Sequence, residues 1–432
     1  MLAQGNLMTC FMIILFGSAV WFSRGFYNAS APLLVILFVV WVFARILLPA
    51  RSARNAFPKC ELYFYRFFPW FGPLMIAVNP DLMYVDPSLR WAYFLFRFVP
   101  IGITAIARRV LPFMVLLFYL TVLYLSPNPF IDVFHSNSSG VDYFLSGRNP
   151  YSQSYPDIYS GQFDYHPGFL YWPAALYLQT VSKVILGDIR AILVIAWWGA
   201  VFCFPNTNRH SQALRIIWWF IPFIAFAFEQ AWLDPLLSLT AATTLWSIKN
   251  RRWWLMAAAV AMAASVKQYG FVVGLFPTTM LALDREWKVL VKVSLAAFIL
   301  FLFALAPFLI WDTHGLLTMT ITAHTSARAR PDALNFTAFW MRHTGSPFPV
   351  FAQVGITLYG FCLAVFHLIK NRERRRLMVI AESWAIAFGF AMLFGKFAFC
   401  NYYWLLISFW ILSLAFENVE GPDFKILGEL RE

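Results

Sequence analysis

Ionisable side chains gather in one polar stretch of the chain, residues 128–173, which lies between long apolar segments. It carries four carboxylates, two histidines and an arginine: Asp132, Asp142, Asp157, Asp164, His135, His166 and Arg148. Long loops between apolar segments are usually functional or disordered. The Tyr, Phe and Trp side chains of this stretch argue against disorder, because they bury surface and pack. We therefore interpret the stretch as a reaction or binding site.

Asp132 has the position of a general base. It follows the apolar run 110–125 behind Pro127 and Pro129, which restrict the backbone and stiffen the exit from that run. A carboxylate fixed at a membrane surface is suited to take a proton from a hydroxyl nucleophile. An acidic residue that only marks the end of a helix is an equal alternative.

Other residues of the stretch are candidate substrate contacts. The serines at 138–139 are expected to cap a short helix that ends near residue 146 and carries Asp142. Arg148 and Tyr151 lie in the turn RNPY, and Tyr165 and His166 open an aromatic run. His166 is expected to contact a lipid phosphate. For each of these residues, a solvated or interfacial role without a ligand is also open.

The composition places the chain in a bilayer. It is 61% hydrophobic and 12% charged, whereas soluble domains carry about 25% charged residues. The 33 basic residues exceed the 21 acidic ones. This excess falls in short clusters between apolar runs, which is the positive-inside pattern rather than a nucleic-acid surface. The five cysteines have no metal-site or disulfide spacing.

Apolar runs near the length of a bilayer crossing predict an all-α membrane protein with about 12 transmembrane helices. The expected runs are 7–22, 31–48, 110–125, 190–204, 214–228, 235–248, 253–266, 270–283, 290–311, 350–369, 377–394 and 402–416. The run 168–186 is rich in Tyr and Trp, so we interpret it as a juxtamembrane or re-entrant helix on the far side.

Charge clusters give the expected domain organisation. Residues 1–109 are expected to form a helical hairpin followed by a basic cytoplasmic or interfacial segment, 49–109. Residues 110–416 form the body, with outside loops at 127–189 and 312–349. Residues 417–432 are a cytoplasmic tail.

This topology brings further ionisable residues to the extracytoplasmic face, where each is a functional hypothesis. Two carboxylates of one tight turn, Glu229 and Asp234, are expected to orient a sugar hydroxyl or to form only a polar hairpin tip. Gln230 of the same turn is a candidate substrate contact. Lys267 departs from the charge rule and is expected to meet a phosphate, next to Gln268 as a substrate contact. The loop 312–349 adds arginines and histidines that hold a phosphate or are solvated; the candidates are His324, Arg328 and Arg330.

The order of short motifs resembles a known family. IDVFHSNSSGVDYFLSGRNPY (131–151), the Tyr-His-Pro of 165–167, EQAW (229–232) and SVKQYGF (265–271) look like the GT-C superfamily of integral-membrane glycosyltransferases. The chain is most similar to the polyprenol-phosphate-mannose-dependent mannosyltransferase branch, over roughly residues 110–400.

The resemblance implies an activity. A hexose, with mannose favoured, would pass from a polyprenyl phosphate to a lipid or glycan acceptor, on the extracytoplasmic face of the plasma membrane. Asp132 would be the base, the anomeric carbon would invert, and no cofactor or metal is required. A basic residue or histidine of the later outside loop would hold the phosphate. Other members have Lys-Pro where this chain has His166-Pro167.

Two other classes stay open. A secondary transporter or lipid-linked sugar flippase fits a multi-helix chain, but no internal repeat is visible and the ionisable residues gather at one face. A scaffold that binds membrane lipid or a partner chain is the third hypothesis. No Walker loop, GxGxxG, HExxH or CxxC motif is present, so ATP-driven transport and zinc hydrolysis have no support.

Overall fold

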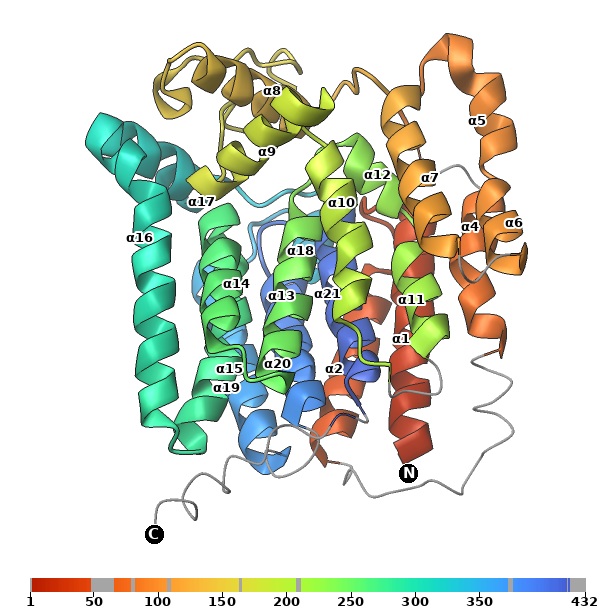
Figure 1. Cartoon of the computed structure of the whole chain (residues 1–432), viewed down its shortest axis with the longest axis vertical. Helices are drawn as coiled ribbons and strands as arrows, with labels where there is room; N and C mark the ends of the chain where they lie inside the picture. Colours follow the sequence, from red (N-terminus) through yellow and green to blue (C-terminus); the bar gives the residue numbers. More distant parts are fainter. Residues whose placement is uncertain are drawn as a thin grey trace.

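The computed structural model describes residues 2–47, 66–78, 82–106, 110–162, 165–206, 211–371, 376–417 and 419. These residues form helices and connecting segments, with one isolated β-bridge between Phe26 and Ala333 and no strand. The predicted all-α fold is therefore confirmed. The longer helices stand side by side as a bundle, and shorter helices lie across one of its ends (Figure 1).

The helix bounds follow the chain in order. In the first half they are α1 (Leu2–Ser23), α2 (Ala31–Leu47), η1 (Phe68–Trp70), α4 (Phe71–Val78), η2 (Pro87–Leu89), α5 (Arg90–Phe96), α6 (Val99–Ile106), α7 (Leu111–Leu125), α8 (Asp132–Leu145), η3 (Pro150–Ser152), α9 (Pro173–Leu186), α10 (Ala191–Ala200) and η4 (Val201–Cys203). In the second half they are α11 (Ser211–Trp219), α12 (Ile224–Glu229), α13 (Asp234–Lys249), α14 (Trp253–Val266), η5 (Gln268–Phe271), α15 (Val272–Leu283), α16 (Trp287–Leu317), η6 (Thr318–Thr322), α17 (Ala323–Ser326), α18 (Phe336–Thr344), α19 (Val350–Asn371), α20 (Arg376–Leu393) and α21 (Cys400–Ala415).

Several helices have the length and apolar character of membrane spans. Among the described residues, these are Trp287–Ser326, Val350–Asn371 and Arg376–Leu393. The pair α9 and α10, bent by 105°, also meets the criterion when taken together. Shorter apolar helices of 10–17 residues accompany them. The structure is thus compatible with a membrane protein, while the total of about 12 spans stays a prediction.

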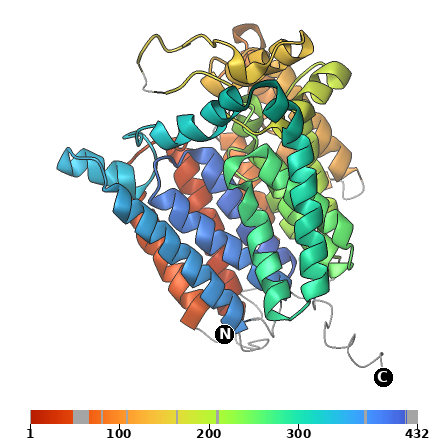
Figure 2. The ribbon, with the colours of Figure 1, turned by 90° about the vertical axis from the view of Figure 1, so that its left-hand side faces the viewer.

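The bundle has a buried centre and an apolar exterior. Helix α20 is almost entirely buried, whereas α16 and α19 are mostly exposed. Their outer faces carry large apolar side chains such as Phe303, Ile310 and Phe351. Figure 2 shows these two helices on one face of the bundle. Apolar faces of this extent suit a hydrocarbon solvent, because in water they would associate.

The two ends of the bundle differ in their contacts. At one end, Lys370 Nζ donates to the carbonyl of Ile46, 2.7 Å away, at the close of α2. At the other end, the turn between α1 and α2 meets the segment that precedes α18, where the Tyr27 N–H donates to the carbonyl of Asp332 at 2.8 Å. The N-terminal hairpin therefore contacts the second of the predicted outside loops.

Residues 82–86 differ from the expectation for segment 49–109. The Asp86 N–H donates to the carbonyl of Leu125 at 2.9 Å, and Ser126 Oγ donates to the carbonyl of Tyr84 at 3.0 Å. These residues therefore lie at the end of α7 that leads to α8, opposite the Ile46 end of α2 (Figure 1). Placing all of 49–109 at the cytoplasmic end is wrong for this part, because basic clusters do not report backbone contacts.

Two predicted helix bounds also differ. The expected run 214–228 is broken into α11 and α12, because Pro222 has no N–H to donate within a helix and Phe223 has a left-handed backbone (φ +68°). Helix α8 begins at Asp132, so the serines at 138–139 lie inside it and do not cap it. An acidic residue in the first turn is favoured by the helix dipole.

Candidate functional site

Asp132 opens α8 and is half-buried. The Tyr159 hydroxyl lies 3.4 Å from Asp132 Oδ1 and 3.3 Å from the Asp132 backbone nitrogen. Burial raises the pKa of the Asp132 carboxyl, against the opposing effects of the Val133 N–H, the Arg330 charge and the Tyr159 hydroxyl. A raised pKa makes the ionised carboxylate a stronger proton acceptor. Asp132 therefore remains the candidate base.

Arg330, in the segment before α18, is close enough for its charge to act on this carboxylate. Its Nε and Nη2 donate to Asp332 Oδ1 and Oδ2, at 2.8 and 2.7 Å, and its guanidinium lies 5.4 Å from the centre of the Phe399 ring. The charges of Asp132 and Arg330 act on each other. The structure thus brings the predicted base together with one of the predicted phosphate ligands, from two distant loops.

Phenol groups surround Asp132. Burial raises the pKa of Tyr84, Tyr159 and Tyr171, and the negative charge of Asp132 adds to the effect. Tyr165, which bonds to Asp157, has its pKa raised to about 12, chiefly by burial. These phenols stay protonated near neutral pH and can donate hydrogen bonds. The surroundings of the carboxylate are therefore aromatic and rich in donors.

The loop over Asp132 is held by Asp157. Its Oδ1 accepts from the Tyr159 N–H at 2.9 Å and its Oδ2 from the Gly161 N–H at 2.6 Å. These bonds lower the pKa of Asp157. His166 follows this loop and is exposed, so it is open to solvent or to a headgroup. Asp164, another carboxylate of the polar stretch, lies outside the described residues.

Lys267 lies buried in a polar cluster beside this site. Its Nζ is 2.9 Å from Asp234 Oδ2, and the rings of Tyr171, Tyr269 and Tyr402 surround it at 5.7, 4.8 and 5.5 Å. Asp234 also balances its charge, so Lys267 does not present a free ammonium to a phosphate. Lys267 was expected to be a simple phosphate ligand because its partner, Asp234, is distant in the sequence and the pairing gave no signal there.

Asp234 is the centre of that cluster. The Tyr269 hydroxyl donates to its Oδ1 at 2.5 Å, and Asn401 Nδ2 donates to its Oδ2 at 3.0 Å. The charges of both Asp234 and Asp132 act on the Tyr171 phenol. Tyr171 therefore lies between the cluster and the candidate base.

Gln268 and His324 converge on one carbonyl. Gln268 Nε2 donates to the carbonyl of Leu170 at 2.6 Å and to that of Thr320 at 2.9 Å. His324 Nε2 lies 3.1 Å from the same Leu170 oxygen. Both side chains thus hold the segment before α9 against η6 and α17. Lys396 Nζ donates to carbonyls just beyond His324, at Thr325 and Ala327 (2.6 and 2.8 Å).

Glu229 and Gln230 are both buried. The Glu229 carboxylate accepts from the N–H groups of Met83 and Tyr84, at 2.9 and 2.7 Å. Burial raises the pKa of Glu229 to about 7. Both oxygens of Glu229 are thus bonded to backbone donors, and the role of this turn in orienting a sugar hydroxyl stays a prediction.

The remaining predicted contacts have other partners or are exposed. Asp142 is ten positions further along α8, about 15 Å at the helical rise, and forms an exposed ion pair with Lys183 of α9, at 2.5 Å. Arg148 is exposed, 4.6 Å from the centre of the Tyr143 ring. Tyr151 is buried, and its hydroxyl donates to the carbonyl of Tyr171 at 2.8 Å. Arg328 is exposed in the segment after α17.

Residues that the sequence did not single out complete the site. The charge of Asp132 acts on Tyr84, Tyr159 and Tyr171, and the buried Arg190 lies 4.9 Å from the centre of the Phe134 ring in the same helix. The available signal for Arg190 was a lone arginine before an apolar run. The sequence did not indicate Tyr84 as a site residue, because residues 49–109 were assigned to the cytoplasmic end of the bundle. Within the described ranges, no group of three or more His, Cys, Asp or Glu side chains is placed to hold a metal.

Comparison with protein-family models, with curated proteins and with solved structures gives no match to this chain.

Proposed function

We propose that this chain is an integral-membrane glycosyltransferase of GT-C type. It moves a hexose, with mannose favoured, from a polyprenyl-phosphate-linked donor to a lipid or glycan acceptor on the extracytoplasmic face. The electrostatic interaction of Asp132 with Arg330 supports the proposal: the charge of a cation from a separate loop acts on a half-buried carboxyl at one end of an apolar bundle. A base opposite a phosphate-binding cation is what this transfer requires.

The chemical step follows from these roles. Asp132 takes the proton of the acceptor hydroxyl as its oxygen attacks the anomeric carbon. The bond to the phosphate oxygen breaks on the opposite face, with inversion, and the polyprenyl phosphate leaves as an anion. Arg330, with Arg328 and His324 from the same region, stabilises that anion. The exposed apolar faces of α16 and α19 support a place for the polyprenyl chain.

A secondary transporter or lipid-linked sugar flippase is the second candidate. The break between α11 and α12 and the buried Lys267–Asp234 pair favour it, because transporters use discontinuous helices and buried charges near their binding sites. The half-exposed position of Asp132 at the bundle end favours the enzyme instead.

The test measures transfer of radiolabelled mannose from a synthetic polyprenyl phosphate to a membrane extract by purified protein. Asp132→Asn removes the base and keeps the shape. Asp86→Asn is the matched control: its exposed carboxylate only accepts hydrogen bonds from Ser88. We expect wild type and Asp86→Asn to transfer, and Asp132→Asn to be slower by about 100-fold or more. Full turnover by Asp132→Asn would remove it from the mechanism.

Glucose and arabinose donors extend the same assay. Transfer from one of them would keep the enzyme class and change the sugar. If all donors give no transfer, the flippase is tested by following labelled lipid-linked sugar across a vesicle bilayer. Movement that depends on the protein would then replace the glycosyltransferase proposal.

A further inference from the structure

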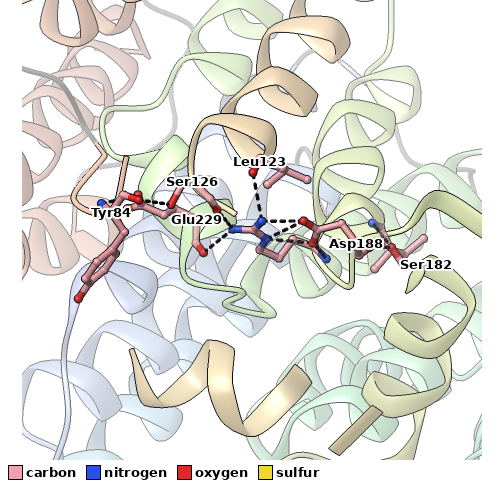
Figure 3. Close-up of polar contacts among 8 residues, drawn as sticks. Tyr84, Leu123, Ser126, Ser182, Asp188 and Glu229 are labelled. Carbon is pink, nitrogen blue, oxygen red and sulfur yellow. Dashed lines mark hydrogen bonds and ion pairs between the residues drawn. The ribbon is translucent and has the colours of Figure 1, made fainter. Parts of the chain in front are cut away.

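A buried arginine, Arg190, joins three segments near the start of α8. Arg190 has no exposed side-chain surface. Its Nη1 donates to the carbonyls of Ser126 and Glu229, at 2.8 and 3.2 Å, and its Nη2 to the carbonyl of Leu123 at 3.2 Å (Figure 3). Its Nε and Nη2 also pair with Asp188, at 2.9 and 2.6 Å. The C-terminal carbonyls of α7 are thereby fixed to the ends of α9 and α12.

Glu229 extends this network to a fourth segment. Its two carboxylate oxygens accept from the N–H groups of Met83 and Tyr84. Ser126 Oγ donates to the carbonyl of Tyr84 at 3.0 Å, as Figure 3 shows. The backbone of Tyr84 is therefore held on both sides, by a carboxylate at its nitrogen and by a hydroxyl at its oxygen.

The side chain of Tyr84 is close enough to the candidate base for the Asp132 charge to act on it. The charge of Asp132 acts on the Tyr84 phenol, and the Tyr84 phenol acts on that of Tyr159, which itself contacts Asp132. Tyr84 is half-buried, and none of its contacts within the described ranges is a hydrogen bond from its hydroxyl. The Tyr84 hydroxyl is thus available to donate a hydrogen bond to a substrate that binds near the Asp132 carboxylate.

We propose that Tyr84 is a substrate-contacting residue beside Asp132, and that Glu229 is the positioning residue that holds it there. The inference rests on the proposed function and adds a residue to that site. The Tyr84 hydroxyl donates a hydrogen bond to the acceptor sugar next to the oxygen that Asp132 deprotonates. Glu229 does not touch the substrate and acts through the Tyr84 backbone.

The same network also fixes the other side of the site. The Arg190 guanidinium lies 4.9 Å from the centre of the Phe134 ring, two residues after Asp132 in α8. Asn137 Nδ2, one turn further, donates to the carbonyl of Ala231 at 3.2 Å. Tyr84 and Asp132 are therefore held by one network, and their spacing is set by residues 229–231 and Arg190.

The first test compares Tyr84→Phe with Tyr124→Phe in the transfer assay. Tyr84→Phe removes the hydroxyl and keeps the backbone N–H that Glu229 accepts. Tyr124 is an exposed tyrosine at the end of α7 and is the matched control. We expect kcat/KM to fall about 10-fold in Tyr84→Phe, as for one lost substrate hydrogen bond, and to be unchanged in Tyr124→Phe. Equal rates in both variants would overturn the role of Tyr84.

A double-variant cycle separates positioning from stability. Glu229→Gln keeps the side-chain shape but turns an amide NH2 toward one of the two backbone donors. If Glu229 acts through the Tyr84 hydroxyl, the loss of kcat/KM in Glu229→Gln with Tyr84→Phe equals the loss in Tyr84→Phe alone. Independent, multiplying losses would overturn the positioning role, because a structural effect does not depend on the Tyr84 hydroxyl.

Amide hydrogen exchange tests the clamp without any activity. The Met83 and Tyr84 amides should exchange slowly in wild type and Tyr84→Phe and at least about 10-fold faster in Glu229→Gln. Fast exchange in wild type would overturn the clamp. If wild type shows slow exchange but transfers no sugar, the clamp stands, and the proposed function falls together with the substrate role of Tyr84.

Discussion

The buried pair of Lys267 and Asp234 gives a prediction whose size follows from its contacts. Lys267 Nζ has one carboxylate acceptor, Asp234 Oδ2 at 2.9 Å, and otherwise faces aromatic rings. Asp234 has two more donors, the Tyr269 hydroxyl and Asn401 Nδ2. Removing Lys267 and removing Asp234 should therefore lower the free energy of unfolding by different amounts.

Breaking a buried ion pair costs about 3–5 kcal/mol. Lys267→Met leaves Asp234 with two donors, so we expect the lower end of that range, about 3 kcal/mol. Asp234→Asn leaves the Lys267 ammonium without an anion, and cation–π contacts return only about 1–2 kcal/mol. We expect the upper end for this variant, about 5 kcal/mol. In the double variant the asparagine oxygen accepts from Tyr269, so stability should lie within about 2 kcal/mol of wild type.

The assay is chemical unfolding in detergent micelles at fixed pH, followed by tryptophan fluorescence, with all four proteins compared. A coupling energy of about 3 kcal/mol or more is expected, since contacting residues are non-additive. The reasoning would be refuted if the stability losses of the two single variants sum to the loss of the double variant within about 0.5 kcal/mol. Loss of transfer in Lys267→Met with wild-type stability would instead restore Lys267 as a phosphate ligand.

Three further predictions follow from single residues. Arg190→Lys replaces a guanidinium that bonds to four acceptor groups by an ammonium with three donors. The free energy of unfolding should therefore fall by about 2 kcal/mol or more. A loss below about 0.5 kcal/mol would contradict the stabilising role of the Arg190 bonds. For Glu229, burial raises the folded-state pKa from 4.5 to about 7, so its stabilising effect is complete below pH 4.5 and is lost as pH rises through 7. The free energy of unfolding should therefore fall by about 3 kcal/mol across this pH range. Glu229→Gln should remove this fall, which is measured by comparing unfolding at pH 5 and pH 8. For Asp132, burial raises the pKa above 3.8, so the acidic limb of the kcat/KM profile should lie above that value; a limb at or below 3.8 would contradict its role as base.

Helix bounds were predictable where charges or turn residues border an apolar run. The predicted run 253–266 coincides with α14, because Arg251 and Arg252 precede it and Lys267 follows it. The break between α11 and α12 was missed, since the residues around Pro222 are as apolar as the helices beside them. Hydropathy alone does not reveal such a break, whereas the missing N–H of proline does.

The candidate site was predictable only in part. Asp132 and Arg330 were selected by residue type and by loop, and the structure brings them together. The pairing of Lys267 with Asp234 was not predictable, because it joins helices whose register the sequence does not give. The position of Tyr84 was not predicted, because residues 49–109 were all assigned to the cytoplasmic side from their density of basic residues. That rule counts arginines and lysines and is silent on short segments that return to the opposite end.

The carboxylates of the described residues differ in how completely they are bonded, and this difference singles out Asp132. Glu382 is paired with Arg45 and, at 2.8 Å, with His367. Asp234 accepts from three side chains. Both of these groups have their negative charge matched, which is what a structural carboxylate requires. Burial disfavours the ionised form of Glu229 as well, but its two oxygens accept from backbone N–H groups and its side chain is buried.

Asp132 lacks such a set of partners. Its nearest side-chain donor is the Tyr159 hydroxyl, at a long 3.4 Å, and its cation, Arg330, is already bound by two bonds to Asp332. A half-buried carboxyl that is solvated poorly and bonded weakly has an ionised form of high free energy. Binding a substrate proton lowers that free energy, whereas for the matched carboxylates it would break existing bonds. The incomplete bonding of Asp132 is therefore a physical reason to place the base there and not at another acidic residue.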